Sequence, residues 1–312
     1  MNKSAIEYIT ITMDYVNQRI DNFLITRLKG VPKTRVYRLL RKGEVRVNKK
    51  RIPPSYRLQA GDCVRLPPLR LPDNKPMTLK PSRSLAALLA DRILYEDNYL
   101  FILNKPSGIP VHGGTGASMG VIEALRVMYP HLPHLELAHR LDLGTSGCLI
   151  IAKKRSILKE LHELFRSGEI KKRYWLLTKG HWKEKEVRVN APLQKNQLSS
   201  GERFVRVSTE GKSATTLFRV LKTFDHAEWV EATLLTGRTH QIRVHAQYSH
   251  HPIAGDDKYG DALFNKEIRA AGLKRMFLHA HQVEFTLSSL NHSIKVEAPL
   301  DHDLTACLTC LT

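Results

Sequence analysis

The chain of 312 residues has no long apolar run and few cysteines. No stretch of about 18 consecutive apolar residues is present, so a membrane-spanning helix is not expected. The segment from Met1 to Glu7 lacks the apolar region of a secretion signal. We therefore expect a cytoplasmic protein whose 4 cysteines are reduced thiols rather than disulfides.

Motifs for metals and nucleotide cofactors are also scarce. Cys307 and Cys310 have CxxC spacing, but no second pair supplies the remaining ligands of a zinc site. The 15 histidines are scattered, and His131 and His134 flank a proline instead of forming HExxH on a helix. The sequence has no P-loop or dinucleotide-binding fingerprint. We expect neither a metal nor a cofactor.

Negative charge is in short supply. The chain has 49 Lys and Arg against 30 Asp and Glu, a formal net charge of +19. Residues 1–70 hold 16 basic and 5 acidic residues, a net of +11. Hydrophobic residues make up 42% of the chain, which is enough for a real core. This balance favours a polyanionic partner, nucleic acid before an anionic membrane.

The length suggests two domains, and residues 17–68 predict the first. Apolar residues at helical spacing indicate one helix over Ile20, Phe23, Leu24 and Leu28. A second, basic helix has Val36, Leu39 and Leu40 on one face and ends near Gly43. Short strands are expected around Val47 and at 63–66, with a basic turn after the first.

The second helix and the turn carry many cations and little acid. They are Lys33, Arg35, Arg38, Arg41, Lys42, Lys49 and Lys50. A charged helix is often only a solvated face, but a basic helix followed by a basic hairpin favours a phosphate-binding surface. The order helix, turn, basic helix, basic strand pair resembles the S4-type RNA-binding domain. The resemblance implies that these cations bind RNA.

The second domain is expected at 92–312, after a proline-rich, semi-extended linker at 69–91. Strands are predicted at 93–96, 99–103, 148–152, 173–178, 215–221, 228–235, 283–287 and 293–297. Helices are predicted at 119–128, 156–167 and 239–248. Together they indicate an α+β domain built on a long mixed, mainly antiparallel β-sheet with flanking helices.

Asp142 stands out within the segment HRLDLGTSG at 139–147. The apolar run at 148–152 follows it and predicts a buried strand, so Asp142 is expected on a loop held by a rigid sheet. A neighbouring guanidinium such as that of Arg140 favours an ionised carboxylate. These residues fit a catalytic carboxylate and an ordinary surface ion pair equally well.

Three further polar segments bear on that choice. Lys105 lies in the loop sequence NKPSG at 104–108. Tyr174 follows a basic cluster and fits either base stacking or an aromatic position in a half-buried strand. In GRTHQIRVH at 237–245, Thr239 is expected to cap a helix, and Arg243 lies one turn beyond it.

With HRLDxxTSG at 139–147, GRTHQIRVH at 237–245 and DDxYG at 256–260, the chain resembles the pseudouridine synthases that act on ribosomal and transfer RNA. The resemblance covers nearly the whole chain. It implies cofactor-free isomerisation of uridines in 23S rRNA by the domain at 92–312, on a nucleotide flipped out of its stack. The expected partner is large-subunit rRNA or its precursor particle, bound by a monomer without a membrane.

The same resemblance implies roles for individual residues. Asp142 would be the catalytic aspartate, Arg243 its ion-pair partner, and Tyr174 the group that stacks on the uracil. Arg140 would fill the space that the flipped nucleotide vacates. Lys105 is a candidate for phosphate binding or active-site support.

Two other classes of protein compete with this interpretation. A non-catalytic RNA-binding or ribosome-assembly factor would need only the S4-like module and the positive charge. A glycosidase would ordinarily need two carboxylates flanking the scissile bond, whereas the HRLDLGTSG segment contains one.

Overall fold

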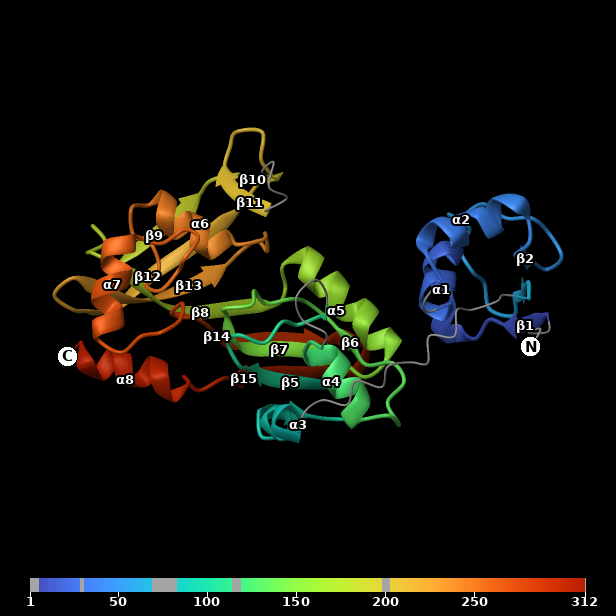
Figure 1. Cartoon of the computed structure of the whole chain (residues 1–312), viewed down its shortest axis with the longest axis horizontal. Helices are drawn as coiled ribbons and strands as arrows, with labels where there is room; N and C mark the ends of the chain where they lie inside the picture. Colours follow the sequence, from blue (N-terminus) through green and yellow to red (C-terminus); the bar gives the residue numbers. More distant parts are fainter. Residues whose placement is uncertain (1–5, 29–30, 69–82, 114–118, 198–202, 312) are drawn as a thin grey trace. The chain divides into compact units, whose positions relative to one another are not determined.

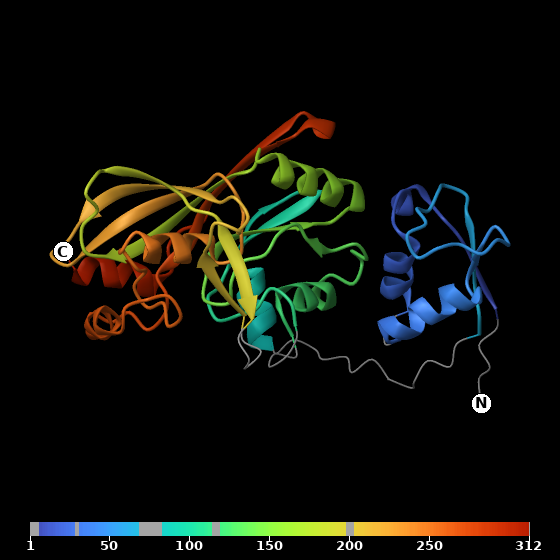
Figure 2. The same cartoon turned by 90° about the horizontal axis from the view of Figure 1, so that it is seen from above.

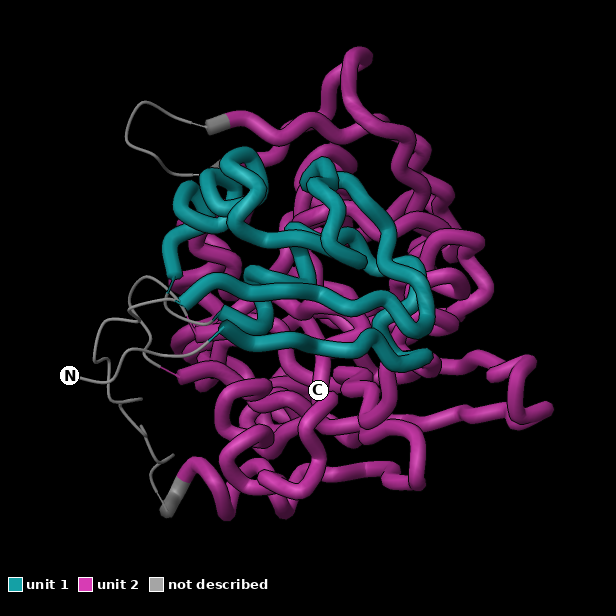
Figure 3. The backbone as a smooth tube through the Cα atoms, turned by 90° about the vertical axis from the view of Figure 1, so that its right-hand side faces the viewer, with its two compact units in different colours: residues 1–79 teal, residues 80–312 magenta. Residues whose placement is uncertain are grey.

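The computed structural model describes residues 6–28, 31–68, 83–113, 119–197 and 203–311. The chain divides into two compact units, Met1–Leu79 and Lys80–Thr312 (Figure 3). Among the described residues, no helix is long and apolar enough to cross a membrane.

The smaller unit packs two helices against a three-stranded antiparallel sheet of order β1-β3-β2. Its elements are β1 (Glu7–Thr10), the 3₁₀ turn η1 (Met13–Tyr15), α1 (Ile20–Arg27), α2 (Lys33–Lys42), β2 (Arg46–Val47) and β3 (Cys63–Leu66). The apolar faces predicted for both helices are buried in one core. Gly43 ends α2 in the left-handed conformation with φ +68°, where glycine carries no steric penalty.

The smaller unit begins earlier than the boundaries 17–68 predict. Strand β1 pairs along its whole length with β3, and Ile11 is buried in the core. The sequence of β1 hides this pairing because three of its side chains are exposed and Ile9 alone is partly buried. An edge strand of this kind lacks the apolar alternation that identifies strands.

A ten-stranded sheet forms the larger unit. Its main path is β4 (Ile93–Glu96), β5 (Leu100–Lys105), β7 (Ser146–Ala152), β14 (Leu278–Leu287), β8 (Lys171–Lys179), β13 (Ala227–Leu234), β12 (Thr215–Thr223) and β9 (Glu186–Asn190). Strand β6 (Glu136–Leu137) adds to β7, and β15 (His292–Glu297) adds to β14. Because β7 and β14 pair in parallel and the other pairs are antiparallel, the predicted mixed, mainly antiparallel α+β fold is confirmed.

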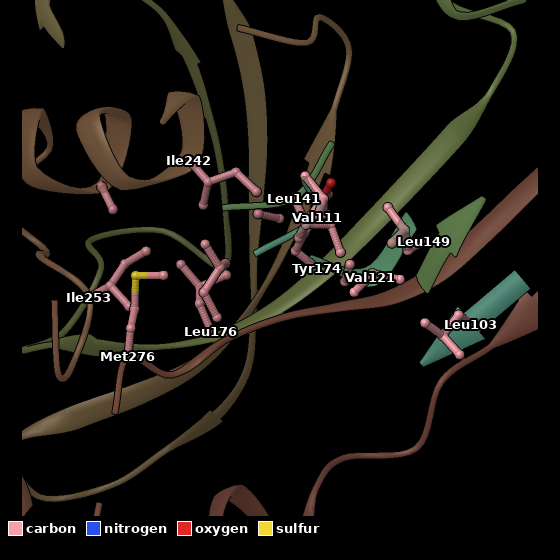
Figure 4. Close-up of a cluster of buried hydrophobic side chains, with 14 of the residues drawn as sticks. Leu103, Val111, Val121, Leu141, Leu149, Tyr174, Leu176, Ile242, Ile253 and Met276 are labelled. Atoms are coloured by element: carbon pink, nitrogen blue, oxygen red, sulfur yellow. The ribbon is translucent and has the colours of Figure 1, made fainter. Parts of the chain in front are cut away.

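Helices cover both faces of this sheet (Figures 1 and 2). Helix α5 (Arg155–Ser167) lies on one face, and α3 (Arg83–Ala90) and α4 (Val121–Met128) lie on the other. Alternation along β7 explains the layers: Cys148 and Ile150 belong to the core of α5, whereas Leu149 and Ile151 belong to the core of α4. Figure 4 shows Leu149 in the second of these cores.

Helix α3 occupies the last part of the segment predicted as linker. Residues 69–82 lie outside the described residues, but 83–90 form a helix whose Leu89 is fully buried. The proline-rich composition ends at Pro81, and the helix begins two residues later. The prolines up to Pro81 led to a linker prediction for the whole segment, although residues 83–90 are helical.

Helix α6 (Gln241–Tyr248) agrees with the helix predicted at 239–248. The elements that the sequence patterns did not predict include the hairpin of β10 (Leu193–Gln197) and β11 (Arg203–Val207), α7 (Ala262–Ala270), η2 (Ser288–Leu290) and α8 (His302–Cys310). Threonine and cysteine are weak helix formers, and they are frequent in α8. Packing of Leu304 and Cys307 against a buried core stabilises this helix instead.

Candidate active site

Asp142 lies on the loop between β6 and β7, as the sequence predicts. Its backbone carbonyl accepts a hydrogen bond from the amide of Thr145 at 3.1 Å, which closes a tight turn. Gly147 follows with φ +105°, and a Cβ there would lie 2.3 Å from the Ala280 carbonyl oxygen on β14. The loop is therefore held against the centre of the sheet, and the Asp142 side chain remains 19% exposed.

Arg243, on the first turn of α6, is the guanidinium that reaches Asp142. Its Nη1 lies 3.3 Å from Asp142 Oδ2. The other two donors, Nε and Nη2, bind both oxygens of the fully buried Asp256 at 2.7 Å each. Burial works against the charge on Arg243, but the two carboxylates raise its pKa. Burial likewise opposes ionisation of Asp256, yet the bonds from Arg243 hold the Asp256 pKa below its usual range.

His240 also approaches Asp142. It precedes α6 in the left-handed conformation, with φ +54°, and its Nε2 lies 3.7 Å from Asp142 Oδ2. Its Nδ1 lies 2.9 Å from the hydroxyl of Tyr259, whose ring in turn lies 4.9 Å from the Arg243 guanidinium carbon. Burial lowers the pKa of His240, although the charge of Asp142 opposes this.

Asp142, His240 and Arg243 line a cavity of about 580 Å³. Among the described residues that line it, Asp142 is the one acid, and the cations are Arg140, Arg166, Lys172, Arg238 and Arg243. Arg140 is exposed at the cavity and makes no ion pair with a described carboxylate, so the neighbouring guanidinium is not the counter-ion of Asp142. The cavity is thus a cationic site around one carboxylate.

Tyr174 forms part of the wall of this cavity. It belongs to β8, is 8% exposed, and packs with Leu141 and Ile242 in the core shown in Figure 4. Burial raises its pKa, and the nearby charge of Asp142 raises it further. The phenol therefore stays neutral and presents a flat apolar surface to the cavity.

Lys105 is buried beside the loop that carries Asp142. Its side chain is fully buried, and its ammonium donates to the carbonyls of Pro106, Ile109 and Leu143 at 2.8–3.4 Å. Burial lowers its pKa to about 7. Because three backbone carbonyls accept from the ammonium, this placement favours active-site support, the second of the two expected roles, over phosphate binding. Lys105 ties the 106–109 loop to the Asp142 loop.

The cap of α6 also differs from the prediction. Thr239 makes no capping bond, and His240 is the N-cap residue. The amide side chain of Gln241 folds back instead, accepting from the Arg238 amide at 3.0 Å and the Thr236 hydroxyl at 2.8 Å. Gln241 is buried, and its side-chain amide nitrogen donates to the Thr215 carbonyl. This network aligns α6 with β12.

The sequence alone indicates no individual role for His240, Asp256 or Tyr259. The motif DDKYG at 256–260 contains Asp256 and Tyr259, but its connection to Arg243 depends on a turn between Ile253 and Gly260. A buried pairing between a helix and a distant turn has no local sequence pattern. The one local indication of this turn is the occurrence of Asp256 and Tyr259 next to Gly260.

The predicted RNA-binding cations of the smaller unit are accessible. Lys33, Arg38, Arg41, Lys42, Lys49 and Lys50 are exposed and Arg35 is partly exposed. None of these side chains forms an ion pair with a carboxylate in the described part of the chain. Asn48 and Lys49 have positive φ, which closes the tight turn that carries Lys49 and Lys50. The described residues contain no cluster of three or more potential metal ligands.

The sequence of the chain matches known protein families and relatives. Residues 99–248 match the RNA pseudouridylate synthase family, and residues 18–64 match the S4 domain. The chain is 52% identical over 309 residues to ribosomal large subunit pseudouridine synthase C of Salmonella typhimurium, covering 98% of this chain and 97% of the relative. It is 52% identical over 306 residues to the protein of the same name from Escherichia coli K12, covering 97% and 96%.

Solved structures agree with the sequence comparison. Human RNA Pseudouridylate Synthase Domain Containing 4 superposes with a TM-score of 0.61 at 27% identity, covering 73% of this chain and 95% of that one. Human RNA Pseudouridylate Synthase Domain Containing 1 gives 0.58 at 25%, covering 69% and 86%. The chain belongs to the pseudouridine synthase family of isomerases and carries an S4 domain.

Proposed function

We propose that this enzyme converts specific uridines of 23S rRNA to pseudouridine, with Asp142 as its single catalytic carboxylate. The observation that carries the proposal is the placement of Asp142 as the one acid, among described residues, in a cationic cavity. Full-length relatives named for the ribosomal large subunit support the choice of rRNA. The excess of 19 positive charges suits a large polyanionic substrate.

The reaction is balanced without a co-reactant. The bond between N1 of uracil and C1′ of ribose breaks, a bond from C5 to C1′ forms, and the hydrogen lost from C5 is matched by a proton gained at N1. A carboxylate can assist by attacking the sugar, by adding to the base or by removing a sugar proton. Each role requires Asp142 to be ionised and held in place. Arg243 supplies both requirements.

A uridine inside a helix or stem cannot reach this cavity unless it leaves its stack, at a cost of a few kcal/mol. Tyr174 is suited to stack on the extruded uracil because its neutral ring forms a wall of the cavity beside Asp142. Arg140 is suited to occupy the vacated space in the RNA because its guanidinium is exposed and has no carboxylate partner among the described residues. The exposed Arg166 offers further positive charge for the backbone phosphates.

The S4 domain would hold the rRNA through its exposed cations, leaving the unit from residue 92 onward to perform the chemistry. We propose that the protein acts as a monomer in the cytoplasm on large-subunit rRNA or its precursor particle. An ordinary glycosidase mechanism is disfavoured because Asp256, the nearest second carboxylate on Arg243, is fully buried and already binds both Nε and Nη2.

The test is pseudouridine mapping by carbodiimide treatment and primer extension on 23S rRNA from cells that lack this protein. Specific stops should disappear in these cells and return with the wild-type gene, but not with Asp142→Asn. Unchanged stops in the deletion strain would rule out 23S rRNA as the substrate. Restoration by Asp142→Asn would rule out the catalytic aspartate. A purely structural RNA-binding factor would lose no stops.

A further inference from the structure

His240 faces Asp142 from a strained position. A non-glycine residue with φ +54° is uncommon, and such strain persists where the surroundings over-determine it. Here the Gln241 side chain binds the backbone amide of Arg238, two residues before His240, and the Tyr259 hydroxyl holds the His240 ring. The imidazole lines the cavity and is 17% exposed.

The bonds of Tyr259 determine which imidazole nitrogen carries the proton. The Tyr259 side chain is buried, and its oxygen accepts from the Val205 amide at 3.0 Å. Within the described part of the chain, its O–H has one available acceptor, His240 Nδ1 at 2.9 Å. A proton on Nδ1 would leave the buried phenol O–H without an acceptor, which is unfavourable. Nδ1 therefore accepts, and the proton resides on Nε2.

With that tautomer, the protonated Nε2 lies 3.7 Å from Asp142 Oδ2. This separation is longer than a hydrogen bond, so the donor approaches the carboxylate without yet binding it. Arg243 reaches the same oxygen at 3.3 Å. A shift of a few tenths of an ångström in the Asp142 side chain would bring the imidazole into bonding range.

One turn of the chain supports both groups that approach Asp142. Asp256 binds Arg243 and Tyr259 binds His240, and the amide of Tyr259 also donates to Asp256 at 3.0 Å. The charged groups that act on His240 are Asp142, Arg243, Lys258 and Asp256. The turn at 256–259 thus holds two donors that converge on one carboxylate oxygen.

We propose that His240 is a positioning residue for Asp142, a neutral Nε2–H donor that Tyr259 orients and that binds the ionised carboxylate when substrate fills the cavity. This inference rests on the proposed catalytic role of Asp142. Losing the donor leaves the Asp142 carboxylate less firmly oriented toward the substrate. Losing one such hydrogen bond should slow the reaction about tenfold.

The test compares His240→Asn with His240→Gln. Asparagine tolerates the left-handed backbone but is too short to reach Asp142, whereas glutamine places an amide N–H near the position of Nε2. The exposed His250, with φ +66°, provides the matched controls His250→Asn and His250→Gln. Single-turnover tritium release from 23S rRNA transcribed with 5-tritiated uridine is measured at neutral pH.

We expect His240→Asn to slow release about tenfold at neutral pH. His240→Gln should recover most of the rate, and both His250 variants should match the wild type. Tyr259→Phe, which frees Nδ1 to take the proton, should resemble His240→Asn. An unchanged rate in His240→Asn, or equal slowing by asparagine and glutamine, would refute the role.

Asp142→Asn distinguishes a failure of the positioning role of His240 from a failure of the proposed function. If Asp142→Asn is inactive while both His240 variants behave as wild type, the positioning role fails and the proposed function stands. If Asp142→Asn retains its turnover, the proposed function fails, and the inference about His240 fails with it.

Discussion

Asp142 and Arg243 are separated by 101 residues in the chain, yet a guanidinium nitrogen of Arg243 lies 3.3 Å from a carboxylate oxygen of Asp142. The same guanidinium makes two shorter bonds, both 2.7 Å, to Asp256. The stronger bidentate pair fixes Arg243, and the longer contact leaves lone pairs of Asp142 available to substrate. Asp256 thus holds Arg243 in place, and Arg243 acts as the counter-ion of Asp142.

Asp142→Asn removes the charge and preserves the size of the side chain. We expect turnover to fall at least about 1000-fold, as for other groups that act directly in a reaction, with RNA affinity nearly unchanged. Tritium release and filter binding measure the two quantities. Asp257→Asn is the control, because the Asp257 side chain is 83% exposed. Turnover of Asp142→Asn within tenfold of the wild type would contradict the assignment.

Asp256→Asn breaks a buried ion pair and leaves Arg243 with Asp142 as its remaining carboxylate partner among the described residues. Breaking such a pair costs about 3–5 kcal/mol of unfolding free energy. The 3 tryptophans are Trp175, Trp182 and Trp229, all in the larger unit, so their fluorescence follows denaturation of that unit. Asp257→Asn should change the same free energy by less than about 0.5 kcal/mol. Equal effects of the two variants would contradict the structural role of Asp256.

His279 should make the larger unit sensitive to acid. It is fully exposed to solvent in the unfolded chain, but in the fold it is buried between Ser146 and the Ala298 carbonyl, and burial lowers its pKa to about 4 from an ordinary 6.5. The unfolded chain therefore binds the additional proton between these values. Its contribution to stability is complete above about pH 6.5 and is lost as the pH falls toward 4.

The loss over that window amounts to about 3 kcal/mol. His279→Gln should flatten the dependence of unfolding free energy on pH between 4 and 6.5, measured by tryptophan fluorescence in denaturant at several pH values. The exposed His302→Gln should leave the dependence as it is. An identical slope in wild type and His279→Gln would show that His279 is not the group responsible.

The S4 domain should supply part of the salt dependence of RNA binding. Replacing Arg38, Arg41 and Lys42 by glutamine removes three exposed charges of α2. The slope of log affinity against log salt concentration should then decrease by about 2–3. Arg27→Gln is a useful control because Arg27 already pairs with Glu7 at 2.8 Å. A wild-type slope in the triple variant would show that these three charges of α2 face solvent and do not contact RNA phosphates.

Several features could be predicted because they arise from neighbouring residues. The apolar spacing of Val36, Leu39 and Leu40 identified α2, and the run after Gly147 identified β7. Strand β1 and helix α3 could not be identified in this way, since one is an edge strand and the other follows a proline-rich segment. Their stability comes from contacts with distant parts of the chain.

The amino-acid sequence by itself determined the family, the cationic character and the loop that carries Asp142. Tertiary structure alone decided that Lys105 is buried, that Asp256 fixes Arg243, and that His240 faces Asp142 from a strained backbone. The physical reason is the range of the interactions. Helix and strand patterns depend on residues a few positions apart, whereas the ionisation and orientation of a side chain depend on whichever charges and donors the folded chain brings within a few ångströms.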